Sequence, residues 1–172
     1  MLNAKLVELL QRLRTSRFRD LAGAHVTASV PVSETILNEL IAATLPPNAP
    51  VRSASIRPET DNHFSVRIAP KAALMPSITL KLVIEEQPQL PASGVLVLRM
   101  VTLGGLFGLA SGAIGGFLPR GVQLQGERIL VDLRTLAAER GFSEAFDYLT
   151  SLRIQTIDGR LLLHVEGSIA PR

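Results

Sequence analysis

An uncharged stretch over residues 100–119 constrains this chain more than any other feature, because four of its glycines recur at every fourth position. These are Gly104, Gly108, Gly112 and Gly116, and on a helix a spacing of four places them in one nearly straight row. Each glycine inside a helix costs roughly 0.5–1 kcal/mol relative to alanine, so the row needs a compensating role. Large apolar side chains occupy the other side of the predicted helix.

The glycine row is compatible with three roles. It packs closely on a sheet, it mediates the association of membrane-spanning helices, or it belongs to a mobile element that opens an apolar cavity or enters a bilayer surface. The strand predicted before it takes the first residues of the uncharged stretch, which leaves about 16 for the helix, short of the ~20 that span a bilayer. Close packing is therefore favoured, and it leaves room for a ligand cavity on the apolar side.

The positive charge of the chain is concentrated in residues 1–20, where the sequence predicts a basic amphipathic helix. Five basic and two acidic side chains give this segment +3, which equals the net charge of the whole chain. The helix covers part of the core in one interpretation, and in the other it binds an anionic membrane surface. The second interpretation assigns the membrane contact to Lys5, Arg12, Arg14, Arg17 and Arg19.

The same segment bears on partners and location. No aromatic side chains alternate with its bases, as stacking on nucleic acid would require, so no nucleic-acid partner is expected. Charges interrupt its leucines and no small-residue cleavage site follows, so no signal peptide is predicted. We expect the protein in the cytoplasm or peripherally on a membrane.

Residues 21–172 are predicted to form a single α+β domain with a largely antiparallel sheet. A strand over 22–30 leads into a helix with Ser33 as its N-cap, and four strands follow between residues 51 and 101. The last of these is apolar on both sides and is expected to be central. Residues 121–133 read as one strand with a break at Gly126. A hairpin about Asp158–Gly159 ends the domain, and we expect it to join the main sheet.

Patterns that carry catalysis or bind metals are missing from the sequence. The chain has no cysteine, which excludes thiolate metal sites and cysteine nucleophiles. Its three histidines each stand alone, and no serine lies in a G-x-S-x-G motif. Glu85 and Glu86 are neighbours on a predicted strand, so they point to opposite faces and cannot act as an acid/base couple. We expect no enzyme, and therefore no catalytic residue, no cofactor and no metal.

The order of elements resembles that of small bacterial members of the tubular lipid-binding superfamily, which includes bactericidal permeability-increasing protein. The resemblance covers residues 22–170. It rests on a strand leading into VPVSETILNELI, on ITLKLVIEEQP, and on an apolar helix followed by LPRGVQLQGERILVDL. It implies a long curled sheet wrapped around the apolar glycine-rich helix, with acyl chains in the trough between them. The superfamily has no catalytic motif, so a binding protein is implied. Relatives of this type are often exported or tethered to membranes, which leaves the location open.

We therefore expect non-enzymatic binding of a lipid or another long apolar ligand in a trough between the sheet and the helices. The predicted apolar lining is Ile36, Leu40, Leu82, Leu106, Phe107, Ile114 and Phe117. Arg99 and Arg120 are candidates for binding a headgroup, although Arg99 is favoured to pair with Glu127 or Asp132 within the sheet. The alternative is an interaction or structural protein whose glycine-faced helix mediates self-association, as in a homodimer, or membrane attachment without a ligand.

Overall fold

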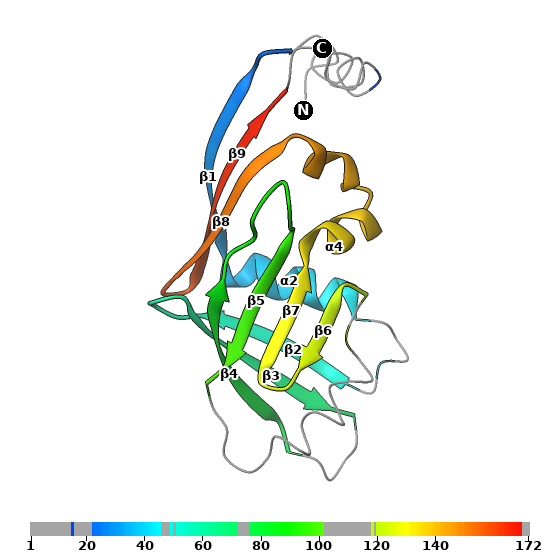
Figure 1. The fold of residues 1–172 in the computed structure, drawn as a ribbon. Helices are drawn as coiled ribbons and strands as arrows, with labels where there is room; N and C mark the ends of the chain where they lie inside the picture. Colours follow the sequence, from blue (N-terminus) through cyan, green and yellow to red (C-terminus); the bar gives the residue numbers. More distant parts are fainter. Residues whose placement is uncertain are drawn as a thin grey trace, which may run out of the picture.

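The computed structural model describes residue 15, residues 22–45, residue 49, residues 51–71 and 76–101, residue 118 and residues 120–169. These residues form an α+β fold with antiparallel strands in two sheets and two short α-helices (Figure 1). Six strands in the order β2-β3-β4-β5-β7-β6 make a curled half-barrel. Three strands in the order β1-β9-β8 make a second sheet, which we call the ribbon. The predicted α+β class is confirmed, with two sheets in place of the expected single sheet.

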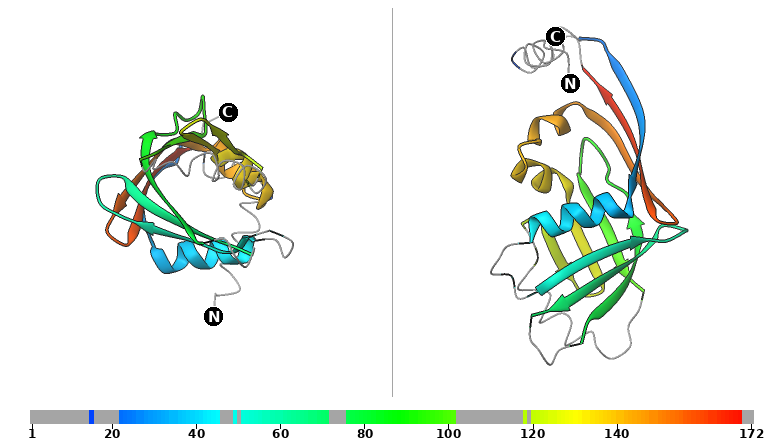
Figure 2. Two further views of the ribbon diagram at one scale, coloured as in Figure 1. Left: turned by 90° about the horizontal axis from the view of Figure 1, so that it is seen from below. Right: turned by 180° about the vertical axis from the view of Figure 1, so that it is seen from behind.

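The half-barrel is built from strands in which apolar and polar residues alternate, so that one face collects the apolar side chains. Figure 2 shows the curl of this sheet from below. Its strands are β2 (Val51–Pro58), β3 (His63–Pro70), β4 (Ile78–Glu86), β5 (Val95–Met100), β6 (Val122–Gln125) and β7 (Arg128–Asp132). β5 lies between β4 and β7, which confirms that the strand apolar on both sides is central.

The ribbon consists of β1 (His25–Ser33), β8 (Leu149–Ile157) and β9 (Arg160–Ser168). The predicted Asp158–Gly159 turn joins β8 to β9, as expected. The expectation that this hairpin joins the main sheet is wrong, because β9 pairs with β1 along nine residues and forms a separate sheet. Alternation along a strand determines which side chains share a face, but it does not determine which strand becomes the neighbour.

The segment over residues 121–133 also differs from the prediction. It folds into two strands, β6 and β7, which pair with each other, where the sequence suggested one strand with a break. Gln125 pairs with Arg128, so Gly126 and Glu127 form a two-residue turn in which Gly126 has φ 59°. A glycine at positive φ is typical of such a tight turn, and this is the position where the prediction placed a break.

Helix α2 (Glu34–Thr44) begins where predicted. The Oγ of its N-cap Ser33 accepts a hydrogen bond from the Ile36 N–H at 3.3 Å, as expected for a capping serine. The helix packs along β2. Helix α4 (Leu133–Glu139) follows β7 directly with Asp132 as its N-cap, and the short 3₁₀ helix η2 (Ser143–Asp147) packs beside it.

The hydrophobic core takes its members from both sheets. Leu82 is 3% exposed and Met100 4% exposed, and both belong to the half-barrel. Ile154 of the ribbon is 7% exposed and belongs to the same packed cluster. The two sheets therefore share one core. The predicted amino-terminal helix, apart from Thr15, and the glycine row at residues 104–116 lie outside the described residues.

Candidate functional site

The apolar face of the half-barrel is continuous from strand to strand. Phe64 of β3 pairs with Leu82 of β4, and Leu82 pairs with Met100 of β5. Further along, Leu98 of β5 pairs with Ile129 of β7, which pairs with Leu124 of β6. Because paired residues in a sheet point to the same side, these rows form one apolar surface across the curl.

The ribbon continues this surface. Val30, Leu163 and Ile154 form a row across its three strands, and Ala28 and Val165 belong to the next row. The core cluster contains residues of these rows together with those of the half-barrel, so the two apolar surfaces meet. We call the combined surface the apolar face. In both sheets the paired rows that form it carry no charged side chain.

The part of the apolar face that lies on β1 is partly open to solvent. Val26 is 58% exposed and Val30 is 44% exposed, although both lie on the same side of β1 as the buried rows. Single exposed valines are ordinary on a protein surface. Here two of them lie on the same face of β1, on either side of the half-buried Ala28, so the apolar face passes from core to solvent toward β1.

Side-chain amides attach the ribbon to the half-barrel. Gln87, just after β4, donates from Nε2 to the Ile154 carbonyl at 2.7 Å and accepts the Ile154 N–H at 2.9 Å. Asn62 accepts the Thr156 N–H at 3.3 Å. An amide carries a donor and an acceptor, so it can replace a strand's peptide group at a sheet edge. Both contacts lie on the outer edge of β8, and they fix the junction that makes the apolar face continuous.

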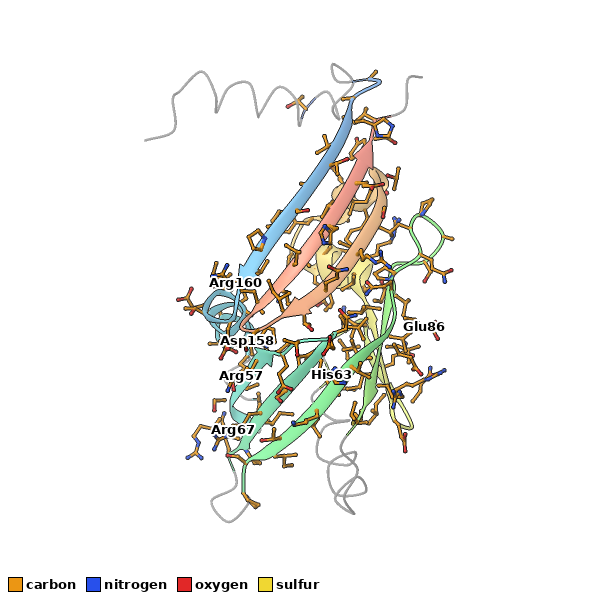
Figure 3. All side chains as sticks on the ribbon, turned by 90° about the vertical axis from the view of Figure 1, so that its left-hand side faces the viewer. Arg57, His63, Arg67, Glu86, Asp158 and Arg160 are labelled. Carbon is orange, nitrogen blue, oxygen red and sulfur yellow. The ribbon has the colours of Figure 1, made fainter. Side chains whose placement is uncertain are left out.

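The hairpin turn secures the other side of this junction. The Gly159 N–H donates to the Pro58 carbonyl at 3.0 Å, and the Glu34 N–H donates to the Gly159 carbonyl at 2.9 Å. Figure 3 shows Asp158 and Arg160 of this turn near Arg57 of β2. One buried polar atom at the junction is left over, because the Oγ1 of Thr156, a residue 4% exposed, has no hydrogen-bond partner among the described residues.

Two of the predicted lining residues lie on α2, and they face away from β2. Asn38 of this helix bonds to the backbone of Ile56, and a helix places residues two positions away from Asn38 on its opposite side. Ile36 and Leu40 are accordingly 48% and 49% exposed. Leu82 is the predicted lining residue that the apolar face contains. The structure therefore does not bring Ile36 and Leu40 into the core cluster around Leu82.

Arg99 has a different partner from the ones expected. Its Nε lies 3.7 Å from Glu85 Oε1, and Arg128 Nε lies 2.8 Å from Glu85 Oε2. The predicted pairing with Glu127 or Asp132 is not formed. The partner of Arg99 follows from the strand register. Arg99 of β5 pairs directly with Arg128 of β7, and both cations approach the carboxylate of Glu85 on β4.

Arg99 lies on the outer face of the sheet, because its neighbours Leu98 and Met100 point into the core. The other headgroup candidate, Arg120, is exposed in the turn before β6. Arg57 and Arg67 also belong to the outer face and are exposed, and Figure 3 labels both. These cations therefore lie on the face of the sheet opposite to the apolar face.

Two carboxyl groups have shifted acidity, and both shifts have local causes. The hydroxyl of Thr135 donates to Asp132 at 2.6 Å and its N–H donates at 3.1 Å, and these bonds lower the pKa of Asp132. The hydroxyl of Ser65 likewise lowers the pKa of Glu59. Hydrogen bonds to the charged form favour ionisation, so both groups stabilise turns or caps as carboxylates.

A serine and a histidine meet on the polar face of the ribbon, which the sequence analysis did not foresee. Ser29 Oγ lies 2.9 Å from His164 Nδ1, and His164 Nε2 lies 3.3 Å from Gln155 Oε1. A nucleophilic serine needs a base that is held by a carboxylate or a similar group able to stabilise the imidazolium. Gln155 is neutral and Ser29 stands exposed on an open sheet face, so the contact is a cross-strand hydrogen bond and not a catalytic arrangement.

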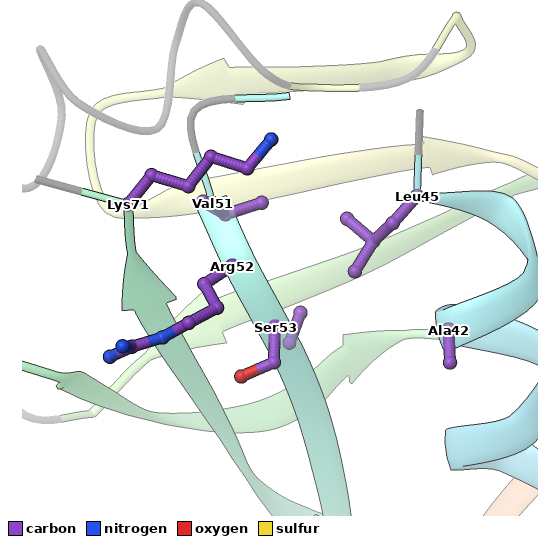
Figure 4. A pocket seen from close by; sticks show the side chains of 7 residues that line it. Ala42, Leu45, Val51, Arg52, Ser53 and Lys71 are labelled. Carbon is purple, nitrogen blue, oxygen red and sulfur yellow. The ribbon is translucent and has the colours of Figure 1, made fainter. Parts of the chain in front are cut away.

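A small pocket lies where α2 ends beside β2 (Figure 4). It encloses about 280 Å³, and Ala42, Leu45, Val51, Arg52, Ser53, Ala54 and Lys71 line it. Sites for drug-sized molecules usually enclose ~300–1,000 Å³. The volume of this pocket is just below that range.

Several predicted site residues cannot be placed. Leu106, Phe107, Ile114 and Phe117 lie outside the described residues, as do the five bases from Lys5 to Arg19. In the described ranges there is no group of three or more potential metal ligands. The joining amides were missed, although Asn38, on the half-buried side of α2 with Leu37 and Ile41, was a signal for one of them.

Comparisons with protein-family models, with curated proteins and with solved structures give no match. No helix in the described part of the chain is both long and apolar enough to cross a membrane.

Proposed function

We propose that this protein binds a lipid or another long apolar ligand along the apolar face and catalyses no reaction on it. The observation that carries the proposal is the continuity of that face across two sheets, from the buried Leu82 to the half-exposed Val26. Binding of a long apolar chain becomes more favourable roughly in proportion to the apolar area that it removes from water. An elongated apolar surface therefore suits a long apolar ligand better than it suits a compact polar ligand.

The arrangement of charge supports the same proposal. The cations of β3, β4 and β5 lie on the outer face of the half-barrel, and two of the basic side chains there share Glu85. A ligand on the apolar face therefore meets no charged side chain of these strands. We further propose that the glycine-rich segment over residues 104–117 covers part of this face and supplies its second wall.

The proposal is tested by identifying what the purified protein carries. The full chain is isolated under native conditions, its mass is measured by native mass spectrometry, and its organic extract is analysed for acyl species. A bound species of stoichiometric amount that disappears on extraction is expected. A protein that carries nothing and binds no fluorescent fatty acid, but associates with itself, would instead favour an interaction protein without a ligand.

A further inference from the structure

The outer edge of β1 is the feature of the fold that the proposed function leaves unused. The described sheets end in four strands, β2, β6, β8 and β1. Asn38 covers β2, the amides of Gln87 and Asn62 cover β8, and β6 has only four residues. β1 has nine residues, and no described element pairs with its outer edge. A long open edge is a template for another strand.

The backbone groups that β1 turns outward follow from its pairing with β9. At one end of this ladder the Ile169 N–H donates to the Ala24 carbonyl at 3.1 Å, and at the other the Glu34 N–H donates to the Gly159 carbonyl at 2.9 Å. Even-numbered residues therefore bond toward β9, and the odd-numbered residues between them turn their N–H and C=O outward. Pro31 is one of these, as expected of a residue without an N–H.

The sequence of β1, HVTASVPVS, is self-complementary around Ala28. Val26 and Val30 flank Ala28 on one face, and Thr27 and Ser29 flank it on the other. In an antiparallel copy related by a two-fold axis at Ala28, each valine lies opposite the other valine of the second copy. Thr27 lies opposite Ser29, and their outward backbone groups form reciprocal hydrogen bonds.

Exposure and charge favour the same pairing. Val26 and Val30 are 58% and 44% exposed, and cross-strand pairing would bury each against its counterpart. β1 carries no Asp, Glu, Lys or Arg, which commonly guard an open edge, and Pro31 near its end is the residue of β1 that limits pairing there. We propose that a second copy of this chain adds its β1 to β1 in this register, so that the two ribbons form one continuous sheet. This inference does not depend on the identity of any ligand.

The strength of such a dimer is limited. A strand-to-strand contact is smaller than the ~1,200–2,000 Å² of typical stable interfaces, so we expect an equilibrium that depends on protein concentration.

Cysteine cross-linking tests the register, because the chain has no cysteine of its own. In the proposed pairing Ala28 faces Ala28 of the second copy as a non-hydrogen-bonded pair with Cα atoms ~4.5 Å apart, within the range of a disulfide. Ala28→Cys should therefore give a disulfide-linked dimer under mild oxidation. Thr27→Cys, which faces Ser29, and Gln123→Cys on β6 are the controls and should not. Equal cross-linking of all three variants, or none in Ala28→Cys, would contradict the proposal.

A proline substitution tests the pairing without a cross-link. Thr27→Pro removes an outward N–H and leaves the bonds to β9 in place, whereas Thr27→Val keeps that N–H. Sedimentation equilibrium should show at least a tenfold weaker dimer for Thr27→Pro and little change for Thr27→Val, with unchanged circular dichroism. A wild-type chain that stays monomeric up to high concentration, or a dimer that resists Thr27→Pro, overturns the proposal, and the second result points to another surface.

Discussion

Asn38 of α2 binds both backbone groups of Ile56 on β2: its Nδ2 donates to the Ile56 carbonyl at 3.0 Å, and its Oδ1 accepts the Ile56 N–H at 2.7 Å. The side chain therefore occupies the place of a neighbouring strand at the edge of the half-barrel. Gln87 likewise forms hydrogen bonds with both backbone groups of Ile154 at the edge of β8. Each amide positions one element against a sheet edge that would otherwise be open.

Replacing Asn38 by alanine should lower the free energy of unfolding by about 1–3 kcal/mol, because the part-buried N–H and C=O of Ile56 lose their partner. The measurement is chemical denaturation monitored by circular dichroism. Glu39→Ala, at the exposed neighbouring position, is the control and should change stability by less than about 0.5 kcal/mol. Equal losses for the two variants would show that the Asn38 bonds contribute little.

Gln87→Ala should loosen the ribbon from the half-barrel more than it lowers global stability. The Ile154 N–H donates to Gln87, so its hydrogen exchange should quicken in the variant, and this opening is local. Amides in the middle of β3 and β4 serve as the internal reference. If the exchange rates of the Ile154 amide and of these reference amides rise by the same factor, Gln87 affects only global stability and does not hold the ribbon locally.

The cap of α4 should give the protein a specific acid sensitivity. The Thr135 hydroxyl lowers the pKa of Asp132, so the bound carboxylate contributes stability that is fully present above its ordinary pKa. That contribution is lost as the pH falls through the lowered pKa. Thr135→Val removes the hydroxyl donor and should raise the pKa of Asp132 and move the acid loss of stability to higher pH.

Carbon-detected NMR titration of Asp132 measures this shift, and Thr79→Val on the outer face of β4 is the matched control. An unchanged Asp132 titration in Thr135→Val would show that the hydroxyl is not the cause.

Replacing Arg99 tests whether this side chain binds a headgroup or only forms a surface ion pair with Glu85. Its side chain is 48% exposed and lies 3.7 Å from Glu85, so Arg99→Ala should cost less than about 1 kcal/mol. Because Arg99 and the apolar face are on opposite sides of the sheet, the substitution should leave binding of a fluorescent fatty acid unchanged. Weaker binding in a stable Arg99→Ala protein would restore its role as a headgroup ligand.

The glycine row at residues 104–116 lies outside the described residues, and substitutions test whether it allows close packing. If Gly108 and Gly112 allow close packing, leucine at either position should destabilise the fold by about 1–3 kcal/mol through overpacking. Alanine is the informative comparison, because on a loosely packed helix it should stabilise by up to about 1 kcal/mol. Stabilisation by alanine at both positions would contradict close packing over the apolar face.

Much of the local structure follows from short patterns in the sequence. Ser33 before an apolar periodic segment predicts the start of α2, and Asp158–Gly159 between alternating strands predicts the β8–β9 turn. These signals are local, since a cap or a two-residue turn depends on side chains a few positions apart. Leu82 was predicted as an apolar lining residue from the alternation along β4, and the structure places it in the buried core.

What could not be predicted depends on contacts between distant segments. Ser29 and His164 are 135 residues apart in the chain, and nothing in either local sequence shows that β1 and β9 become neighbours. The partner of Arg99 was missed for the same reason, because it depends on the register between β4, β5 and β7. The exposure of Ile36 and Leu40 could not be predicted either, because it depends on which side of α2 packs on β2, and that is the side that carries Asn38.

Binding of a fluorescent fatty acid to Val26→Asp and Thr27→Asp tests the central claim most directly. These adjacent residues put the same charge on the same open edge, but Val26 belongs to the apolar face and Thr27 to the opposite face. Both positions are exposed, so both variants should fold. Binding through the apolar face predicts at least tenfold weaker affinity for Val26→Asp and wild-type affinity for Thr27→Asp. Equal affinity in the two variants would contradict the claim that this face holds the ligand.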